Sequence, residues 1–172
     1  PGRGFYEAPI NVSITSPTES AEIRYTVDGS VPTATTGMRY TGAIAISQTT
    51  ILRVAAFREG WWPSPSVTHT YLFLNDVVQQ SQNQALTSGF PSTWNGQPAD
   101  YGLDPRVVGP QDNYGGKYRL SLKEDLRALP SMSLVMAKDD LFGQENGSAI
   151  AGLVSGVIVN PGRGFYEAPI NV

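Results

Sequence analysis

Hydrophobic and polar residues alternate in short stretches through the first 74 residues, which is the period-2 pattern of strands that bury one face. The alternation is clearest at residues 10–15, 23–27, 52–56 and 67–73, and a shorter strand is expected over 40–46. Turn-forming residues separate these stretches, for example Asp28-Gly29-Ser30. Strands at this regular spacing predict a small antiparallel β-sandwich over residues 1–74.

The pattern changes after residue 74. Asn75-Asp76 can cap a helix that runs to about Leu86. Ser121 and Glu124 have the spacing of a capping box for a second helix. Between the two, residues 87–118 are rich in glycine, proline and aromatic residues, which predicts a long ordered loop.

The last third of the chain again contains apolar alternation. Met132, Leu134 and Met136 predict one strand, and residues 153–159 predict a second, buried strand. The fold class expected for the whole chain is therefore mainly β, with a sandwich followed by a smaller mixed α/β module over residues 75–160.

The first twelve residues return without a change as residues 161–172, a spacing of 160 residues. Such self-similarity is the mark of a repeat array, in which 161–172 would begin the next repeat. Two other interpretations stay open: an engineered duplication that adds a spare strand, or a segment that swaps between molecules by strand addition. Under each interpretation the segment is a connector, and its expected contact residues are Phe5, Tyr6, Ile10, Val12, Phe165, Tyr166, Ile170 and Val172.

The composition limits the partners and the cellular locations that we expect for this protein. The formal net charge is −3, so no basic surface is expected to attract nucleic acid. The chain has no cysteine, which excludes disulfides and thiolate metal sites. The apolar run at 149–159 is too short for a membrane span. No signal-like segment opens the chain, so a secretion signal, if one exists, is expected outside it.

Four stretches of the first half resemble the fibronectin type III-associated module, which is similar to the C-terminal domain of chitobiases and β-hexosaminidases. They are Gly4-Phe5-Tyr6-Glu7-Ala8-Pro9, Ile23-Arg24-Tyr25-Thr26-Val27-Asp28-Gly29-Ser30-Val31-Pro32-Thr33 with Tyr40-Thr41-Gly42, and Leu52-Arg53-Val54-Ala55-Ala56-Phe57. The resemblance implies an immunoglobulin-like sandwich and an accessory role, because the catalytic residues of those enzymes lie in another domain.

The second half resembles the linker that precedes spore-coat-type kinase-like domains in large bacterial surface proteins. The similar stretches include Asp100-Tyr101-Gly102-Leu103-Asp104-Pro105 and Asp140-Leu141-Phe142-Gly143. Where those proteins continue into the kinase-like lobe, this chain returns to Gly164-Phe165-Tyr166. No nucleotide site is therefore expected, and the resemblance implies an extracellular, cell-surface location.

No residue set predicts catalysis. His69 is the single histidine and has no sequence neighbour suited to a triad. The adjacent acids Asp139 and Asp140 precede Leu-Phe-Gly and are more typical of a turn than of a catalytic pair. We therefore expect a protein that is not an enzyme.

Two kinds of binding residue remain. Trp61, Trp62 and Trp94 could stack on sugar rings or fill packing interfaces, and we favour packing. Several carboxylates offer oxygen ligands to Ca²⁺, but none has the spacing of a calcium loop, so no cofactor is predicted and Ca²⁺ is kept only as an alternative. These carboxylates are Asp28, Asp100, Asp104, Asp112, Asp139 and Glu145.

The function expected from these observations is structural. The chain is interpreted as one repeat of an extracellular bacterial filament or stalk that assembles head-to-tail through the duplicated segment, with copies of itself or adjacent repeats as partners. The alternative is an accessory carbohydrate-binding module, with polysaccharide as partner, within a larger surface or secreted polypeptide.

Overall fold

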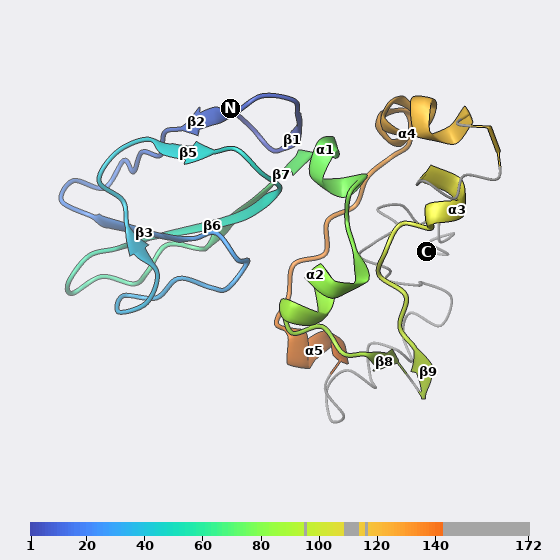
Figure 1. Ribbon diagram of the computed structural model, residues 1–172. Helices are drawn as coiled ribbons and strands as arrows, with labels where there is room; N and C mark the ends of the chain where they lie inside the picture. The colour runs from blue at the N-terminus through green and yellow to red at the C-terminus, as the bar shows by residue number, and fades with distance from the viewer. Residues whose placement is uncertain (95, 109–113, 116, 143–172) are drawn as a thin grey trace, which may run out of the picture. The chain divides into compact units, whose positions relative to one another are not determined.

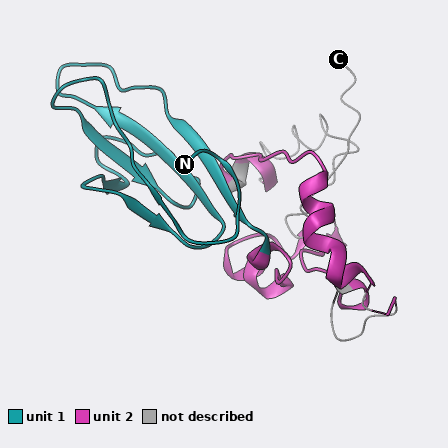
Figure 2. Ribbon diagram, turned by 90° about the horizontal axis from the view of Figure 1, so that it is seen from above, with its two compact units in different colours: residues 1–74 teal, residues 75–172 magenta. Residues whose placement is uncertain are grey.

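The computed structural model describes residues 1–94, 96–108, 114–115 and 117–142. The chain divides into two compact units, which Figure 2 shows in different colours. Unit 1 covers Pro1–Leu74 and unit 2 begins at Asn75. Within the described residues, no helix combines the length and the apolar character that crossing a bilayer requires.

Unit 1 is built from seven strands in two sheets (Figure 1). The strands are β1 (Gly4–Tyr6), β2 (Ile10–Val12), β3 (Glu22–Thr26), β4 (Met38–Arg39), β5 (Ile44–Ile46), β6 (Thr50–Phe57) and β7 (Val67–Phe73). The larger sheet has the order β1-β7-β6-β3-β4, and the smaller sheet pairs β2 with β5. This two-sheet, mainly β architecture agrees with the sandwich predicted from the alternation of apolar and polar residues.

Most neighbouring strands of unit 1 run antiparallel. In the centre of the larger sheet, Tyr25 of β3 lies opposite Val54 of β6, and Leu52 of β6 lies opposite His69 of β7. The exception is β1, which pairs in parallel with β7 and places Gly4 opposite Tyr71. The sheet therefore ends in a short parallel strand contributed by the first residues of the chain.

The hydrophobic core of unit 1 lies between the two sheets. Tyr71 is fully buried at 0% exposure, and Val12 of the smaller sheet is 5% exposed. Further residues pack against this core from both sheets, including Tyr6, whose ring centroid lies 5.7 Å from that of Tyr71. The buried cluster consists of Val12, Ile44, Ile46, Leu52, Tyr71 and Phe73.

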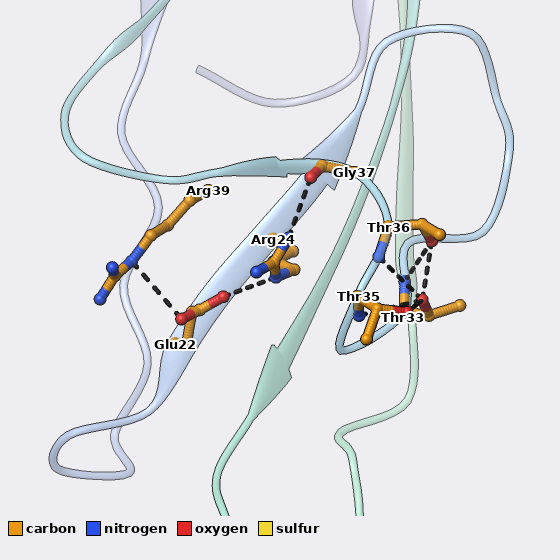
Figure 3. Close-up of polar contacts among 7 residues, drawn as sticks. All are labelled: Glu22, Arg24, Thr33, Thr35, Thr36, Gly37 and Arg39. Carbon is orange, nitrogen blue, oxygen red and sulfur yellow. Dashed lines mark hydrogen bonds and ion pairs between the residues drawn. The ribbon is translucent and has the colours of Figure 1, made fainter.

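Polar contacts hold the other edge of the larger sheet, as Figure 3 shows. Glu22 accepts a 2.5 Å hydrogen bond from Arg24 Nε, and its second oxygen lies 3.5 Å from Arg39 Nε. Arg24 also donates to the carbonyl of Gly37, at 3.2 Å. Gly37 has a φ of +86°, and a Cβ there would lie 2.9 Å from the carbonyl oxygen of Tyr25, so glycine is required at this turn.

The single strand predicted over 40–46 is wrong in one respect. Within this range the structure has only β5 (Ile44–Ile46), in the smaller sheet, whereas β4 (Met38–Arg39) lies just before the range, in the larger sheet. The backbone N–H of Tyr40 still bonds to Ile23, at 2.8 Å, so the chain leaves the larger sheet only after this residue. Gly42 lies where the chain passes from the larger sheet to the smaller one. A regular strand cannot continue through this point because the strand that it would pair with changes.

The described residues of unit 2 form short helices and a small hairpin. The elements are α1 (Leu74–Val77), α2 (Gln82–Thr87), β8 (Thr93–Trp94), β9 (Gln97–Pro98), α3 (Pro105–Val108), α4 (Lys117–Ala128) and α5 (Lys138–Phe142). Tyr101, which is 2% exposed, is their main buried aromatic residue. Its hydroxyl donates to Pro91 at 2.8 Å, and its ring meets Phe90 edge-on at 5.7 Å. The long loop predicted over 87–118 is wrong in part, because the described residues of this stretch include β8, β9, α3 and the start of α4.

The predicted helix over 75–86 is interrupted. Helix α1 ends at Val77 and α2 starts at Gln82, because Ser81 and Gln84 form a capping box that begins a new helix. Ser81 Oγ accepts a 3.3 Å hydrogen bond from the Gln84 N–H, and Gln84 Oε1 accepts one from the Ser81 N–H at 2.7 Å. Reciprocal hydrogen bonds of this type provide acceptors for backbone N–H groups that have no partner within the first turn of a helix.

Two other predictions for this half need correction. Ser121 does not cap α4, because the helix starts at Lys117 and the Ser121 hydroxyl bonds to Asp125 within it, at 2.6 Å. Residues 131–137 form no regular strand, although the alternation at 132–136 predicted one. The strand predicted at 153–159 lies outside the described residues.

Candidate functional site

The N-terminal copy of the repeated segment, residues 1–12, supplies a strand to each sheet of unit 1. Phe5 and Tyr6 lie in β1, at the edge of the larger sheet, and both are half-buried. Ile10 and Val12 lie in β2, opposite Ile46 and Ile44 of β5. The copy therefore crosses from one layer of the sandwich to the other and is part of its structure.

Side-chain contacts fix the start of this copy. The Tyr6 hydroxyl donates to the Gly2 carbonyl at 2.5 Å, and the Tyr71 hydroxyl donates to the Pro1 carbonyl at 3.4 Å. Burial raises the pKa of Tyr71 above its ordinary value, and the neighbouring Tyr6 adds to the shift. Tyr71 therefore stays a neutral donor that links the core to the first residue.

The predicted contact residues of the second copy are Phe165, Tyr166, Ile170 and Val172, and they lie outside the described residues. Their identities match Phe5, Tyr6, Ile10 and Val12 one for one. The second copy therefore carries the same side chains that the first copy places in the sandwich.

A groove of about 360 Å³ opens beside this segment, within unit 1. One side is formed by residues 12–17, and the other by inward-facing residues of the larger sheet, among them Val54, Ala56 and Val67. Pro1 and Tyr71 also line it. The groove exists because a two-stranded sheet cannot cover the whole inner face of a five-stranded one.

The match to a known family concerns this same region. Residues 1–69 match the family model of the chitobiase/β-hexosaminidase C-terminal domain. This result confirms the resemblance predicted for the first half, and that domain is an accessory, non-catalytic part of those enzymes. The match covers 69 of the 172 residues and does not extend into unit 2.

Comparison with whole proteins identifies no relative of this chain. No curated protein and no solved structure matches the chain significantly. The resemblance of the second half to a linker before spore-coat-type kinase-like domains therefore stays a prediction.

The paired tryptophans lie on the loop between β6 and β7. Trp62 is 96% exposed and Trp61 is 64% exposed, so neither fills the interior of unit 1. The Arg58 guanidinium lies 4.9 Å from the centre of the Trp61 ring, a cation–π contact that steadies this indole. Trp94, the third candidate, lies in β8 of unit 2. The structure thus leaves two adjacent indoles open to a ligand or a partner.

The candidate calcium ligands do not form a site in the described part of the chain, which contains no cluster of three metal-binding side chains. Asp28 Oδ1 accepts hydrogen bonds from the Ser30 N–H and hydroxyl, at 3.0 and 2.6 Å. Asp104 binds Arg106 with both carboxylate oxygens and raises its pKa, chiefly through the side-chain hydrogen bonds. Asp112 and Glu145 lie outside the described residues.

His69 faces the groove, and its Nδ1 lies 3.4 Å from the Tyr71 hydroxyl. Serines also line the groove, but its lining residues include no aspartate or glutamate, so a serine–histidine–acid arrangement is not formed among them. The turn predicted at Asp139 and Asp140 is wrong, because both residues belong to the short helix α5.

The groove is not predictable from the sequence. Its lining comes from strands far apart in the chain, and its existence depends on the unequal number of strands in the two sheets. The one local signal was the alternation that assigns Leu52, Val54 and Ala56 to the inner face. Alternation shows which face of a strand is apolar, but it does not show whether another layer covers that face.

Proposed function

We propose that this chain is one repeat of an extracellular bacterial filament or stalk, and that repeats join head-to-tail through the duplicated twelve-residue segment. The observation that carries the proposal is the double role of the N-terminal copy, which provides β1 to one sheet and β2 to the other. An identical segment at 161–172 contains what is needed to begin another sandwich.

The immunoglobulin-like classification of unit 1 is part of this proposal. It is supported by the presence of seven strands in two layers over 74 residues and by the match to the accessory domain family. Modules of this kind serve as spacers when repeated, because each repeat contacts its neighbours and stability grows along the array. The cell-surface location is proposed on the same resemblance.

A substitution at one buried position tests whether the second copy can begin a sandwich. Val12→Asp places a carboxylate where the native side chain is 5% exposed. An uncompensated buried charge costs several kcal/mol, which is comparable to the total stability of a small domain. The first copy should then lose its place, and the intact second copy of another molecule should replace it.

The expected result is that Val12→Asp chains regain the near-ultraviolet circular dichroism of the native sandwich as they form long head-to-tail species in sedimentation velocity. The matched control carries Val12→Asp and Val172→Asp together, and it should neither recover nor assemble. Identical behaviour of the two variants would contradict the proposal. Folded monomers of the single variant would contradict head-to-tail joining between molecules.

Native material offers a second test, since a covalent array needs no exchange of strands. Electron micrographs of the native polymer should show an axial period set by one 160-residue repeat. Isolated particles without such a period would contradict the filament.

The alternative function is an accessory carbohydrate-binding module. It is supported by the exposure of Trp61 and Trp62, which present flat apolar surfaces on one loop. It is also supported by the match of residues 1–69 to a domain of carbohydrate-active enzymes. Sugar rings stack on exposed aromatic faces, and residue pairs give a longer contact than a single ring.

Binding to insoluble chitin tests this alternative directly. Trp61→Ala and Trp62→Ala should each weaken retention of the full chain at least tenfold if the loop binds sugar. Tyr114→Ala removes another exposed aromatic side chain, on unit 2, and should leave retention unchanged. Equal retention of all three variants, or no retention of the native chain on any polysaccharide, would contradict the alternative.

A further inference from the structure

The groove in unit 1 is apolar and open to solvent. Ile23, Leu52 and Val54 line it, and Val67, at its rim, is 57% exposed. Its volume is about 360 Å³. Water in contact with apolar walls is less favourable than an apolar side chain in the same place. The groove is therefore suited to an apolar occupant.

The first residue of the chain shows where an occupant would enter. Because β1 runs parallel to β7 with Gly4 opposite Tyr71, residues before Gly4 extend toward His69 and Val67. Pro1 already lines the groove and accepts the hydrogen bond from Tyr71. A segment that precedes this proline would therefore start at the groove.

The sequence supplies such a segment before the second copy. Residues 157–160 are Val-Ile-Val-Asn, and they lead directly into Pro161, the counterpart of Pro1. β-Branched residues favour an extended strand. Three residues in that conformation span about 10 Å. When the second copy takes the same place in its sandwich as the first, these apolar residues arrive at the corresponding groove.

From these observations we infer that residues 157–159 of one repeat fill the inter-sheet groove of the next sandwich. The inference rests on the proposed tandem function and specifies its junction. The occupant is apolar, covalently attached just before the repeated segment, and extended along β7. The junction between repeats is then packed into the following sandwich instead of being a free linker.

A cysteine accessibility experiment tests the inference on the full 172-residue chain. One version carries Val-Ile-Val-Asn before Pro1, and the matched control carries Ser-Gly-Ser-Asn. Since the chain has no cysteine, Val67→Cys gives a single thiol at the groove. Maleimide labelling of this thiol should be at least tenfold slower with the apolar extension than with the polar one. Ser47→Cys, an exposed position away from the groove lining, should react at equal rates in both versions.

The native groove provides a second readout that needs no substitution in it. His69 is the only histidine and lines the groove, so its imidazole proton signal in NMR reports on this site alone. The signal should shift with the apolar extension and stay in place with the polar one. Equal labelling rates together with an unmoved His69 signal would overturn the inference.

Two further results separate this inference from the function on which it rests. Protection of Val67→Cys in the unextended chain that grows with protein concentration, and that persists when Ser-Gly-Ser replaces residues 157–159, would overturn it, because the occupant would then be another segment. A two-repeat chain in which both sandwiches fold while the second groove stays reactive would also overturn it, but would leave the tandem function standing. Failure of the second sandwich to fold would count against the tandem function itself.

Discussion

The two copies of the repeated segment allow the same substitution to be compared in two contexts. Val12→Ala removes two buried carbon atoms from a side chain that is 5% exposed and belongs to the core cluster. At about 0.8 kcal/mol per buried methylene, the transfer loss is roughly 1.6 kcal/mol. The cavity that remains raises the total to about 2 kcal/mol. For a domain of this size, that loss lowers the melting temperature by about 8–16 °C.

Val172→Ala makes the identical change in the second copy. We expect it to change the stability of unit 1 by less than about 0.5 kcal/mol. The reason is that the first copy is attached to its own sandwich, and this attachment gives it an effective concentration in the millimolar range. At micromolar protein concentration, the first copy should therefore remain in place.

Differential scanning calorimetry measures both variants, and hydrogen exchange of β6 and β7 assigns the affected transition to unit 1. The reasoning would be refuted if Val172→Ala destabilised unit 1 as much as Val12→Ala, because the second copy would then occupy the sandwich. It would also be refuted if Val12→Ala had no effect, since the packing of β2 would then contribute nothing to stability.

Three other predictions concern particular residues. Gly37→Ala should destabilise unit 1 by more than about 1 kcal/mol in urea denaturation, because of the positive φ and the close Tyr25 carbonyl, whereas Gly42→Ala, with open space around it, should cost less than half as much. The pKa of Tyr71 is raised in the folded state, so its contribution to stability is fully present below about pH 10 and is lost as pH rises through the raised value. Tyr71→Phe should therefore flatten the decline of stability at alkaline pH. An unchanged decline in denaturation measured from pH 9 to 12 would contradict this prediction. Ser81→Ala removes the cap of α2 and should cost unit 2 about 1 kcal/mol by calorimetry, while Asn83→Ala on the same helix should cost far less; equal effects would rule out the capping box as the cause.

The positions of β2, β3, β6 and β7 could be predicted because apolar residues recur on one face of each strand, whereas β1 and the exposed strand β4 were not predicted. Leu52, Val54 and Ala56 line the groove side of β6, as the alternation predicts, although Ala55 between the last two is also buried, at 4% exposure. The pairing of strands could not be predicted in the same way. Nothing in Gly4-Phe5-Tyr6 indicates that this stretch joins β7 in parallel, because alternation identifies a face and not a neighbour.

In unit 2 the errors have local causes. The prediction of one helix over 75–86 did not account for a second helix start at Ser81. The side-chain cap at this residue divides the stretch into two helices. At 132–136 the alternating apolar residues satisfied the pattern of a strand, but Met132 is 70% exposed in the described structure. A strand also requires a hydrogen-bonded neighbour, and sequence periodicity contains no information about one.

The candidate site could be predicted only in part. The importance of residues 1–12 followed from their exact recurrence, which is visible in the sequence. The exposure of Trp61 and Trp62 was not predictable, because an indole after a glycine turn can either fold inward or stay outside. The groove could not be predicted, because its shape depends on how the two sheets are arranged.

The parallel pairing of β1 with β7 also has a mechanical consequence. The two strands point the same way, and they adjoin opposite ends of unit 1, β1 near Pro1 and β7 at Leu74. Tension applied between those ends slides β1 along β7, so the bonds of the pair carry the load in shear and must yield together. A peeling geometry would break them one after another at lower force. A sandwich held in this way resists stretching between its two ends.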